Sequence, residues 1–93
     1  MKSYRSEQRI IYDILDTTNY QGRDGITITP LIEKANLSYK RINPFIAKLT
    51  SNGLINKIEV RGKNVFVITE VGQLFLEEYR KFDDFAKSMG LEL

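Results

Sequence analysis

The segment from residue 36 to residue 55 constrains the fold of this chain more than any other. Ser38 is a natural N-cap, because its hydroxyl can accept a hydrogen bond from an N–H group of the first helical turn. After it, apolar side chains recur at the spacing i, i+3, i+4 and i+7, which places them on one stripe of a helix. These residues are Ile42, Phe45, Ile46 and Leu49. Because Gly53 is favourable just beyond a helix end, the segment predicts an amphipathic helix with a defined start and end.

The opposite face of this predicted helix is basic, small or polar and carries no acid. Its residues are Lys40, Arg41, Asn43, Pro44, Ala47, Lys48 and Ser51. Such a face suits a helix that enters the major groove of DNA. Pro44 is awkward at the sixth helical position, because its ring should clash with the carbonyl of Lys40. Either the helix starts after Ser38 and is kinked at the proline, or a regular helix starts only at Asn43. We favour the kink, because Ile42 belongs to the apolar stripe.

Two helices are predicted before this segment. From about Ser3 to Thr18, apolar residues recur at i, i+4 spacing, which is typical of an amphipathic helix. Residues 19–25 are rich in turn formers, and the alternating residues 26–28 are expected to form a very short strand. Thr29 followed by proline is typical of a helix start, so a short helix is expected over Pro30–Ala35. A short helix, a brief turn and a second amphipathic helix make a helix-turn-helix.

Two β-prone runs follow, Ile55–Val60 and Val65–Ile68, and they predict a β-hairpin. The four residues between them include Gly62 and Asn64, which tolerate a positive φ in a tight turn. A hairpin directly after a helix-turn-helix is the wing of a winged helix.

The predicted wing has an apolar face and a cationic tip. Ile58 and Val60 alternate with charged residues, so we expect that strand face to pack on the core. Arg61 and Lys63 lie at the tip, where they can reach backbone phosphates or the minor groove.

The last segment predicts a helix from Thr69, as N-cap, to about Ser88. Val71, Leu74 and Phe75 are expected to complete the core. Beyond them, apolar residues follow the 4-3-4-3 spacing of a heptad seam. The seam residues are Phe75, Tyr79, Phe82, Ala86 and Met89, with Phe85 beside them. We expect the seam to pair with the same helix of a second subunit about a two-fold axis. The alternative is packing on the first helix within one chain.

Composition and charge restrict the class of protein. With 93 residues there is room for one small domain, placed over residues 1–69 and followed by the dimerisation helix over residues 70–93. The absence of cysteine and histidine removes thiolate zinc sites and the commonest general base, so we expect no enzyme, metal or cofactor. No apolar run is long enough to span a membrane and no signal core follows the N-terminus, so we expect a cytoplasmic, nucleoid-associated protein.

The positive charge is concentrated in the middle of the chain. Residues 37–64 hold six basic side chains against one acid, a balance of +5, whereas residues 1–36 are balanced and residues 65–93 carry −3. This distribution would attract a polyanion to one face, although an incidentally basic surface would give the same count.

Several segments, in order, resemble the archaeal winged-helix family of small DNA-binding proteins and transcriptional regulators. They are Arg5–Ser6, Ile10–Leu15, Thr29, Ala35–Tyr39, Phe45–Ile46, Leu49, Gly53–Ile55, Ile68–Gly72 and Phe75–Tyr79. The more specific parts are the turn at Asn36–Tyr39 and the helix start at Thr69–Gly72. The resemblance covers nearly the whole chain. It implies an α+β winged helix-turn-helix, duplex DNA binding, no enzymatic activity, and a homodimer through an antiparallel coiled coil of C-terminal helices.

We therefore predict a small transcriptional regulator that binds double-stranded DNA. Asn43 is suited to bidentate pairing with adenine, and Ala47 to contact with a thymine methyl group. The predicted DNA contacts are Ser38, Tyr39, Lys40, Arg41, Asn43, Ala47, Lys48, Lys57, Arg61 and Lys63. Two alternatives remain open: a winged helix that binds protein within a larger complex, and a sequence-nonspecific architectural chromatin protein.

Overall fold

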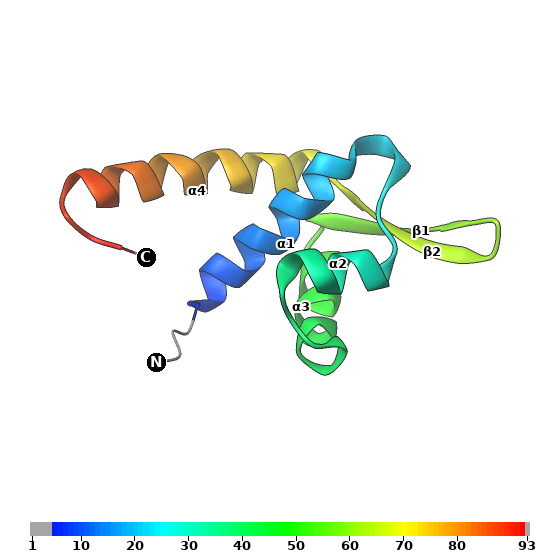
Figure 1. Ribbon diagram of the computed structural model, residues 1–93. Coiled ribbons are helices and arrows are strands. Elements are labelled where there is room, and N and C mark those ends of the chain that lie inside the picture. The colour runs from blue at the N-terminus through cyan, green and yellow to red at the C-terminus, as the bar shows by residue number, and fades with distance from the viewer. Residues whose placement is uncertain (1–4, 93) are drawn as a thin grey trace.

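A computed structural model describes residues 5–92 of the chain (Figure 1). The elements are α1 (Glu7–Gln21), the 3-10 turn η1 (Gly22–Asp24), α2 (Ile28–Ala35), α3 (Tyr39–Ser51), β1 (Ile55–Val60), β2 (Lys63–Ile68) and α4 (Glu70–Ser88). Three helices form the body, an antiparallel two-stranded hairpin forms the wing, and α4 completes the chain. The predicted α+β winged helix-turn-helix with a C-terminal helix is therefore confirmed.

Apolar side chains from all four helices and from the base of the hairpin form one core. The stripe predicted on α3 supplies the buried Ile42, Ile46 and Leu49, and the half-buried Phe45 packs against them. The other buried residues of this core are Ile10, Ile14, Leu15, Ile26, Leu31, Ala35, Leu37, Ile55, Phe66 and Leu76. Burial of an aliphatic or aromatic side chain stabilises the fold by about 1.5–3 kcal/mol. The stripe is therefore what holds α3 against the body.

Within the described residues the first helix follows Ser6, and it ends later than predicted. Ser6 is its N-cap and accepts a hydrogen bond from a first-turn N–H at 3.1 Å, so α1 begins at Glu7. The predicted start near Ser3 lies outside the described residues. The helix continues to Gln21, past the predicted end, and Gly22 then leaves the helical conformation with a φ of 65°.

The strand predicted over residues 26–28 is wrong. Only Ile26 pairs with the sheet, in a single β-bridge to Phe66. The second helix begins two residues earlier than predicted, with Thr27 rather than Thr29 as its N-cap. The proline after Thr29 is therefore the third helical residue. It is tolerated there because N–H groups of the first turn have no intrahelical partner.

Both ends of α3 have the structure that the sequence predicts. The Ser38 hydroxyl accepts a hydrogen bond from the Arg41 N–H at 3.2 Å. At the other end Gly53 adopts a φ of 79°, and the Leu54 N–H bonds to the Leu49 carbonyl at 2.9 Å. This is the Schellman arrangement, in which a left-handed residue satisfies the last helical carbonyl groups.

Pro44 lies inside α3, which is assigned as one helix from Tyr39 to Ser51. The alternative start at Asn43 is therefore wrong. Because proline has no N–H group, the Lys40 carbonyl has no donor four residues later. Lys40 is at an exposed position, where water can satisfy that carbonyl.

The wing is a regular hairpin with a two-residue turn. Val60 pairs with Lys63, and the intervening Arg61 and Gly62 both have positive φ, 54° and 79°. Positive φ at both central residues is the pattern of a type I′ turn, whose twist matches the strands. Of the two residues that tolerate a positive φ, Gly62 adopts it and Asn64 does not; the other positive φ falls on Arg61, and Asn64 is a strand residue.

The outer part of the wing projects beyond the three-helix body (Figure 1). Ile58 and Val60 are 42% and 47% exposed, so the predicted packing of this strand face on the core is wrong. Ile55 and Phe66, at the base of the hairpin, are buried. The alternating pattern is present, but Lys57 pairs with the buried Phe66, so the neighbouring Ile58 and Val60 lie on the opposite strand face, which points away from the core.

The last helix begins after Thr69, as predicted, and packs beside α1 with its far end opposite the wing (Figure 1). Leu76 is buried and Phe75 is half-buried in the core. Val71 and Leu74 are 55% and 56% exposed, so their predicted place in the core is wrong. No helix within residues 5–92 is long and apolar enough to cross a bilayer.

Candidate nucleic-acid interface

A hollow of about 390 Å³ lies between α3, the wing and the start of α2. Four predicted contact residues line it: Tyr39 and Asn43 come from α3, and Lys57 and Lys63 come from the wing. The other lining residues are Thr27, Ile28, Ile46, Asn64 and Phe66. The hollow therefore combines an exposed aromatic ring, two amides and two ammonium groups with buried apolar side chains.

Local structure explains why these side chains share one hollow. Asn43 follows Tyr39 by four residues, so both lie on one side of α3. Lys57 is opposite Phe66 in the strand register, and Phe66 is buried in the core. Lys57 therefore leaves the wing on its inner face. Asn64 precedes Phe66 by two residues and lies on that face as well.

A second hollow of about 470 Å³ continues along α3. Its lining residues are Asn43, Ile46, Ala47, Thr50, Ser51 and Lys57. It contains Ala47, a fifth predicted contact residue. Because the two hollows share Asn43, Ile46 and Lys57, they form one concave surface. We name the residues that line these two hollows the α3–wing surface.

The other predicted contacts border this surface or lie away from it. Lys40 and Arg41 are exposed in the first turn of α3, and Arg61 is exposed at the wing tip. The Ser38 hydroxyl is already engaged as the N-cap of α3. Lys48 lies beside α1, where its Nζ is 2.7 Å from a carboxylate oxygen of that helix, so the structure separates it from the α3–wing surface.

Most of the basic side chains on α3 and the wing have no partner among the described residues. Within residues 5–92, no ion pair or side-chain hydrogen bond engages the basic groups of Lys40, Arg41, Lys57, Arg61 and Lys63. Lys48 differs, because Glu7 of α1 neutralises it. Five positive charges are therefore available to an external anion, and those of Lys57 and Lys63 lie in the lining of the first hollow.

Four polar residues of the surface were not predicted as contacts: Thr27, Thr50, Ser51 and Asn64. Asn64 could have been found from strand alternation, because it lies two residues before the apolar Phe66. Thr27 gives no such signal in the sequence. It lines the hollow only because the start of α2 packs beside β2 in the folded chain.

The predicted dimer residues of α4 fall into two groups. Tyr79 and Ala86 are buried within the chain, and Phe75 is half-buried. Tyr79 stacks on Tyr12 of α1 with ring centroids 4.8 Å apart, so part of the predicted seam is covered by the first helix. The exposed apolar residues of α4 and its C-cap are Val71, Leu74, Phe82, Phe85 and Met89. We name these five residues the α4 stripe.

Comparison with known proteins places the chain in a family. The winged helix-turn-helix family profile matches residues 4–87, so the chain belongs to the winged helix-turn-helix family. Its structure is similar to that of Sso10a-2, described as a DNA-binding protein from Sulfolobus solfataricus. The identity is 22%, the TM-score is 0.76, and the match covers 91% of this chain and 85% of that chain.

The structure is also similar to SSV1 F-93, at 19% identity and a TM-score of 0.63, over 96% of this chain and 97% of that chain. A search of curated proteins gives no match. At these identities the likeness to solved structures concerns the fold. The resemblance to archaeal winged-helix proteins is therefore confirmed at the level of family and fold.

Proposed function

We propose that this protein binds duplex DNA, with α3 in the major groove and the wing on the backbone or in the minor groove. The observation that carries the proposal is the concave α3–wing surface, whose lining includes Lys57 and Lys63, two basic side chains without an ion-pair partner within residues 5–92. Such groups neutralise phosphates, and the release of counterions then drives binding. Family membership and the DNA-binding neighbour support the same function, and we propose the role of a small transcriptional regulator.

The residues of the surface suggest a division of roles. The Asn43 amide offers the donor and acceptor that recognise adenine, and Ala47 follows one turn later, where a thymine methyl group would fit. Lys57 and Lys63 face them from the wing and suit phosphate contacts that set orientation. Lys48 is a weaker candidate than the sequence indicates, because its ion pair with α1 would first have to break.

We propose further that the α4 stripe pairs with the same stripe of a second chain. Phe82 and Phe85 are 55% and 63% exposed, although burial of apolar surface is favourable by about 25 cal/mol per Å². Pairing about a two-fold axis would bury the stripe of each chain on its partner. A dimer would also present two α3 helices to two half-sites of DNA.

Binding to a random-sequence duplex and to a selected duplex, titrated with salt, tests the proposed function. Affinity should fall by about 0.9 log units per log unit of salt for each phosphate contact. Sequence selectivity should appear as a difference between the two duplexes at the same salt concentration. Light scattering on the same samples gives the oligomeric state. A protein that binds neither duplex at low salt contradicts the proposal.

A further inference from the structure

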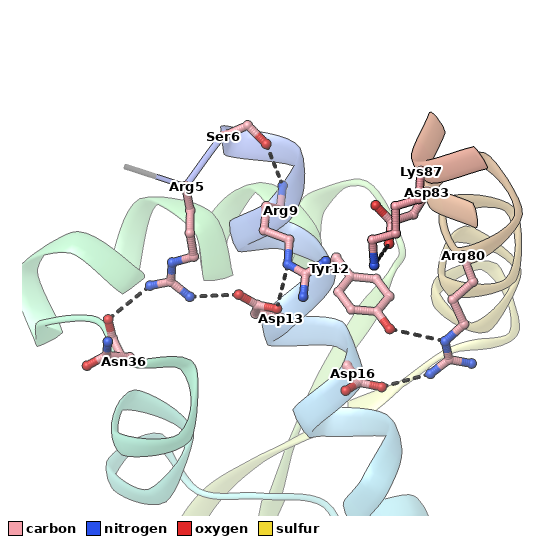
Figure 2. A network of polar contacts seen from close by, with 10 residues as sticks. All are labelled: Arg5, Ser6, Arg9, Tyr12, Asp13, Asp16, Asn36, Arg80, Asp83 and Lys87. Atoms are coloured by element: carbon pink, nitrogen blue, oxygen red, sulfur yellow. Dashed lines mark hydrogen bonds and ion pairs between the residues drawn. The ribbon is translucent and has the colours of Figure 1, made fainter. Parts of the chain in front are cut away.

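One arginine connects the turn before α3 to the first helix (Figure 2). The Arg5 Nη2 donates to the Asn36 carbonyl oxygen at 2.9 Å, and its Nη1 donates to Asp13 Oδ2 at 2.7 Å. Asn36 has the left-handed conformation that ends α2, with φ 57° and ψ 51°. Its carbonyl group lies in the turn that sets the direction of α3. The contact therefore joins this turn to α1 across 31 residues of chain.

Asp13 holds this arginine in place. Its carboxylate also pairs with Arg9, whose Nε is 3.4 Å from Oδ1. The side chains of Arg5 and Asp13 are 29% and 23% exposed, so the pair is partly shielded from water. A guanidinium is a planar group with several fixed donors, so one arginine can bridge a carboxylate and a carbonyl at the same time.

The first helix, α1, also contacts α4, on the side away from the Asn36 turn (Figure 2). Arg80 of α4 donates from Nε to the Tyr12 hydroxyl at 3.2 Å and from Nη2 to Asp16 at 2.8 Å. The Arg9 guanidinium lies 5.0 Å from the centroid of the Tyr12 ring. Polar contacts therefore connect α1 both to the helix-turn-helix turn and to α4.

We propose that Arg5, held by Asp13, is a positioning residue for DNA binding. It sets the orientation of α3 relative to α1, and so relative to α4, without contacting DNA. This inference rests on the proposed function. Because the Arg5 guanidinium is engaged by the chain itself, its loss acts through the geometry of α3 and not through the number of phosphate contacts.

The variant Asp13→Asn separates positioning from electrostatics, because the two effects have opposite signs. Removal of one negative charge by itself favours binding to a polyanion. Loss of the Arg5 contact weakens binding, by about three- to tenfold for a residue that acts at a distance. Asp24→Asn is the matched control, since Asp24 is exposed and has no ion pair within the described residues.

Binding of a selected duplex is measured at several salt concentrations, at a temperature where circular dichroism shows every variant to be folded. Arg5→Gln and Asp13→Asn should both weaken binding, and Arg5→Gln should do so more, because it also removes a positive charge. The double variant should bind no more weakly than Arg5→Gln, because the two residues act as one unit. The slope of log affinity against log salt should not change, whereas loss of a phosphate contact lowers it by about one.

Hydrogen exchange provides a readout that does not involve DNA. The Asn36 and Leu37 amides bond to the Glu33 and Ile32 carbonyl groups, both at 3.2 Å. Their exchange should accelerate in Asp13→Asn and stay unchanged in Asp24→Asn.

Three results overturn the proposal: Asp13→Asn binding as tightly as Asp24→Asn, a reduced salt slope for Arg5→Gln, or unchanged exchange at the turn. A wild-type chain that binds no duplex contradicts the proposed function itself. That failure is distinguishable, because it appears before any variant is compared.

Discussion

Two surfaces of this protein, the α3–wing surface and the surface along α1 and α4, differ in whether their basic side chains have acidic partners. On α3 and the wing, five basic side chains have no ion-pair partner within residues 5–92. Along α1 and α4, Arg80 pairs with Asp16 and donates to Tyr12, and Lys87 lies 3.0 Å from Asp83. The hydrogen bond to Tyr12 raises the pKa of Arg80, and the hydrogen bond to Asp83 raises the pKa of Lys87. In both cases the contact stabilises the charged form.

The difference indicates what each surface is suited to do. A cation with a carboxylate partner contributes to the fold and is largely neutralised toward the outside. Like charges gathered without partners repel one another and lower the stability of the folded state. The α3–wing surface is therefore better suited to an external anion than to stabilising this chain.

The largest effect is expected from reversing charge on the wing. Arg61→Glu combined with Lys63→Glu should weaken duplex binding by about a hundredfold and lower the salt slope by about two, because two phosphate contacts are lost. Fluorescence anisotropy at several salt concentrations measures both. Lys81→Glu, on α4, is the control and should change affinity little, since Lys81 is paired with Glu77 and Glu78. Full affinity of the double wing variant would instead favour the protein-binding alternative.

A charge in the α4 stripe should break the proposed dimer. Phe82→Asp combined with Phe85→Asp should give particles of monomer mass, 10.8 kDa, in light scattering. Both side chains are exposed in the single chain, so each chain should keep its helical circular dichroism. Affinity for a duplex with two half-sites should fall by at least about tenfold, because the two α3 helices are no longer linked. An unchanged mass contradicts pairing through this stripe.

A substitution at the start of α4, away from the α3–wing surface, should lower stability and leave DNA binding intact. A Cβ at residue 72 would collide with the Leu54 carbonyl oxygen and the Ile68 side chain. Gly72→Ala should therefore lower the free energy of unfolding by about 1–3 kcal/mol, as overpacking does, in urea titrations. Gln73→Ala, at an exposed position, should stay within about 0.5 kcal/mol. Wild-type stability of Gly72→Ala would show that the helix start can shift without cost.

The smallest effect is expected from the partnered cations. Arg80→Gln should lower the free energy of unfolding by no more than about 1 kcal/mol, because Arg80 and Asp16 are each 49% exposed and water screens the pair. Duplex affinity should not change. A loss of affinity comparable to that of the wing variant would remove the distinction between the two surfaces.

Local signals in the sequence predicted both ends of α3 and the start of α4. Ser38 and Gly53 act through hydrogen bonds that span only a few residues, so a short pattern contains all the information that they need. Thr69 caps α4 in the same way, but its hydroxyl also donates to the Gly53 carbonyl at 2.6 Å, which no local pattern reveals. The spacing of Thr69 and Gly72 has two causes. The Gly72 N–H donates to the Thr69 hydroxyl that caps α4, and the Leu54 carbonyl oxygen lies too close to Gly72 to leave room for a side chain.

Burial was predicted less well, for a physical reason. Alternation identified Ile58 and Val60 as one face of a strand, and helical spacing grouped Val71 and Leu74, but all four are exposed. Periodicity shows which residues share a face and not whether another element covers that face.

The sequence by itself determined the helix-turn-helix followed by a hairpin and a last helix, the caps of α3, the N-cap of α4, the apolar stripe of α3 and the concentration of charge in residues 37–64. Each of these depends on residues close together in the chain. Only the tertiary structure decided which charges stay unpaired: it placed Glu7 beside Lys48 and Arg5 beside the turn at Asn36. It also gathered Asn43, Lys57 and Lys63 around one hollow. Such contacts join residues far apart in sequence, so they exist only once the chain has folded.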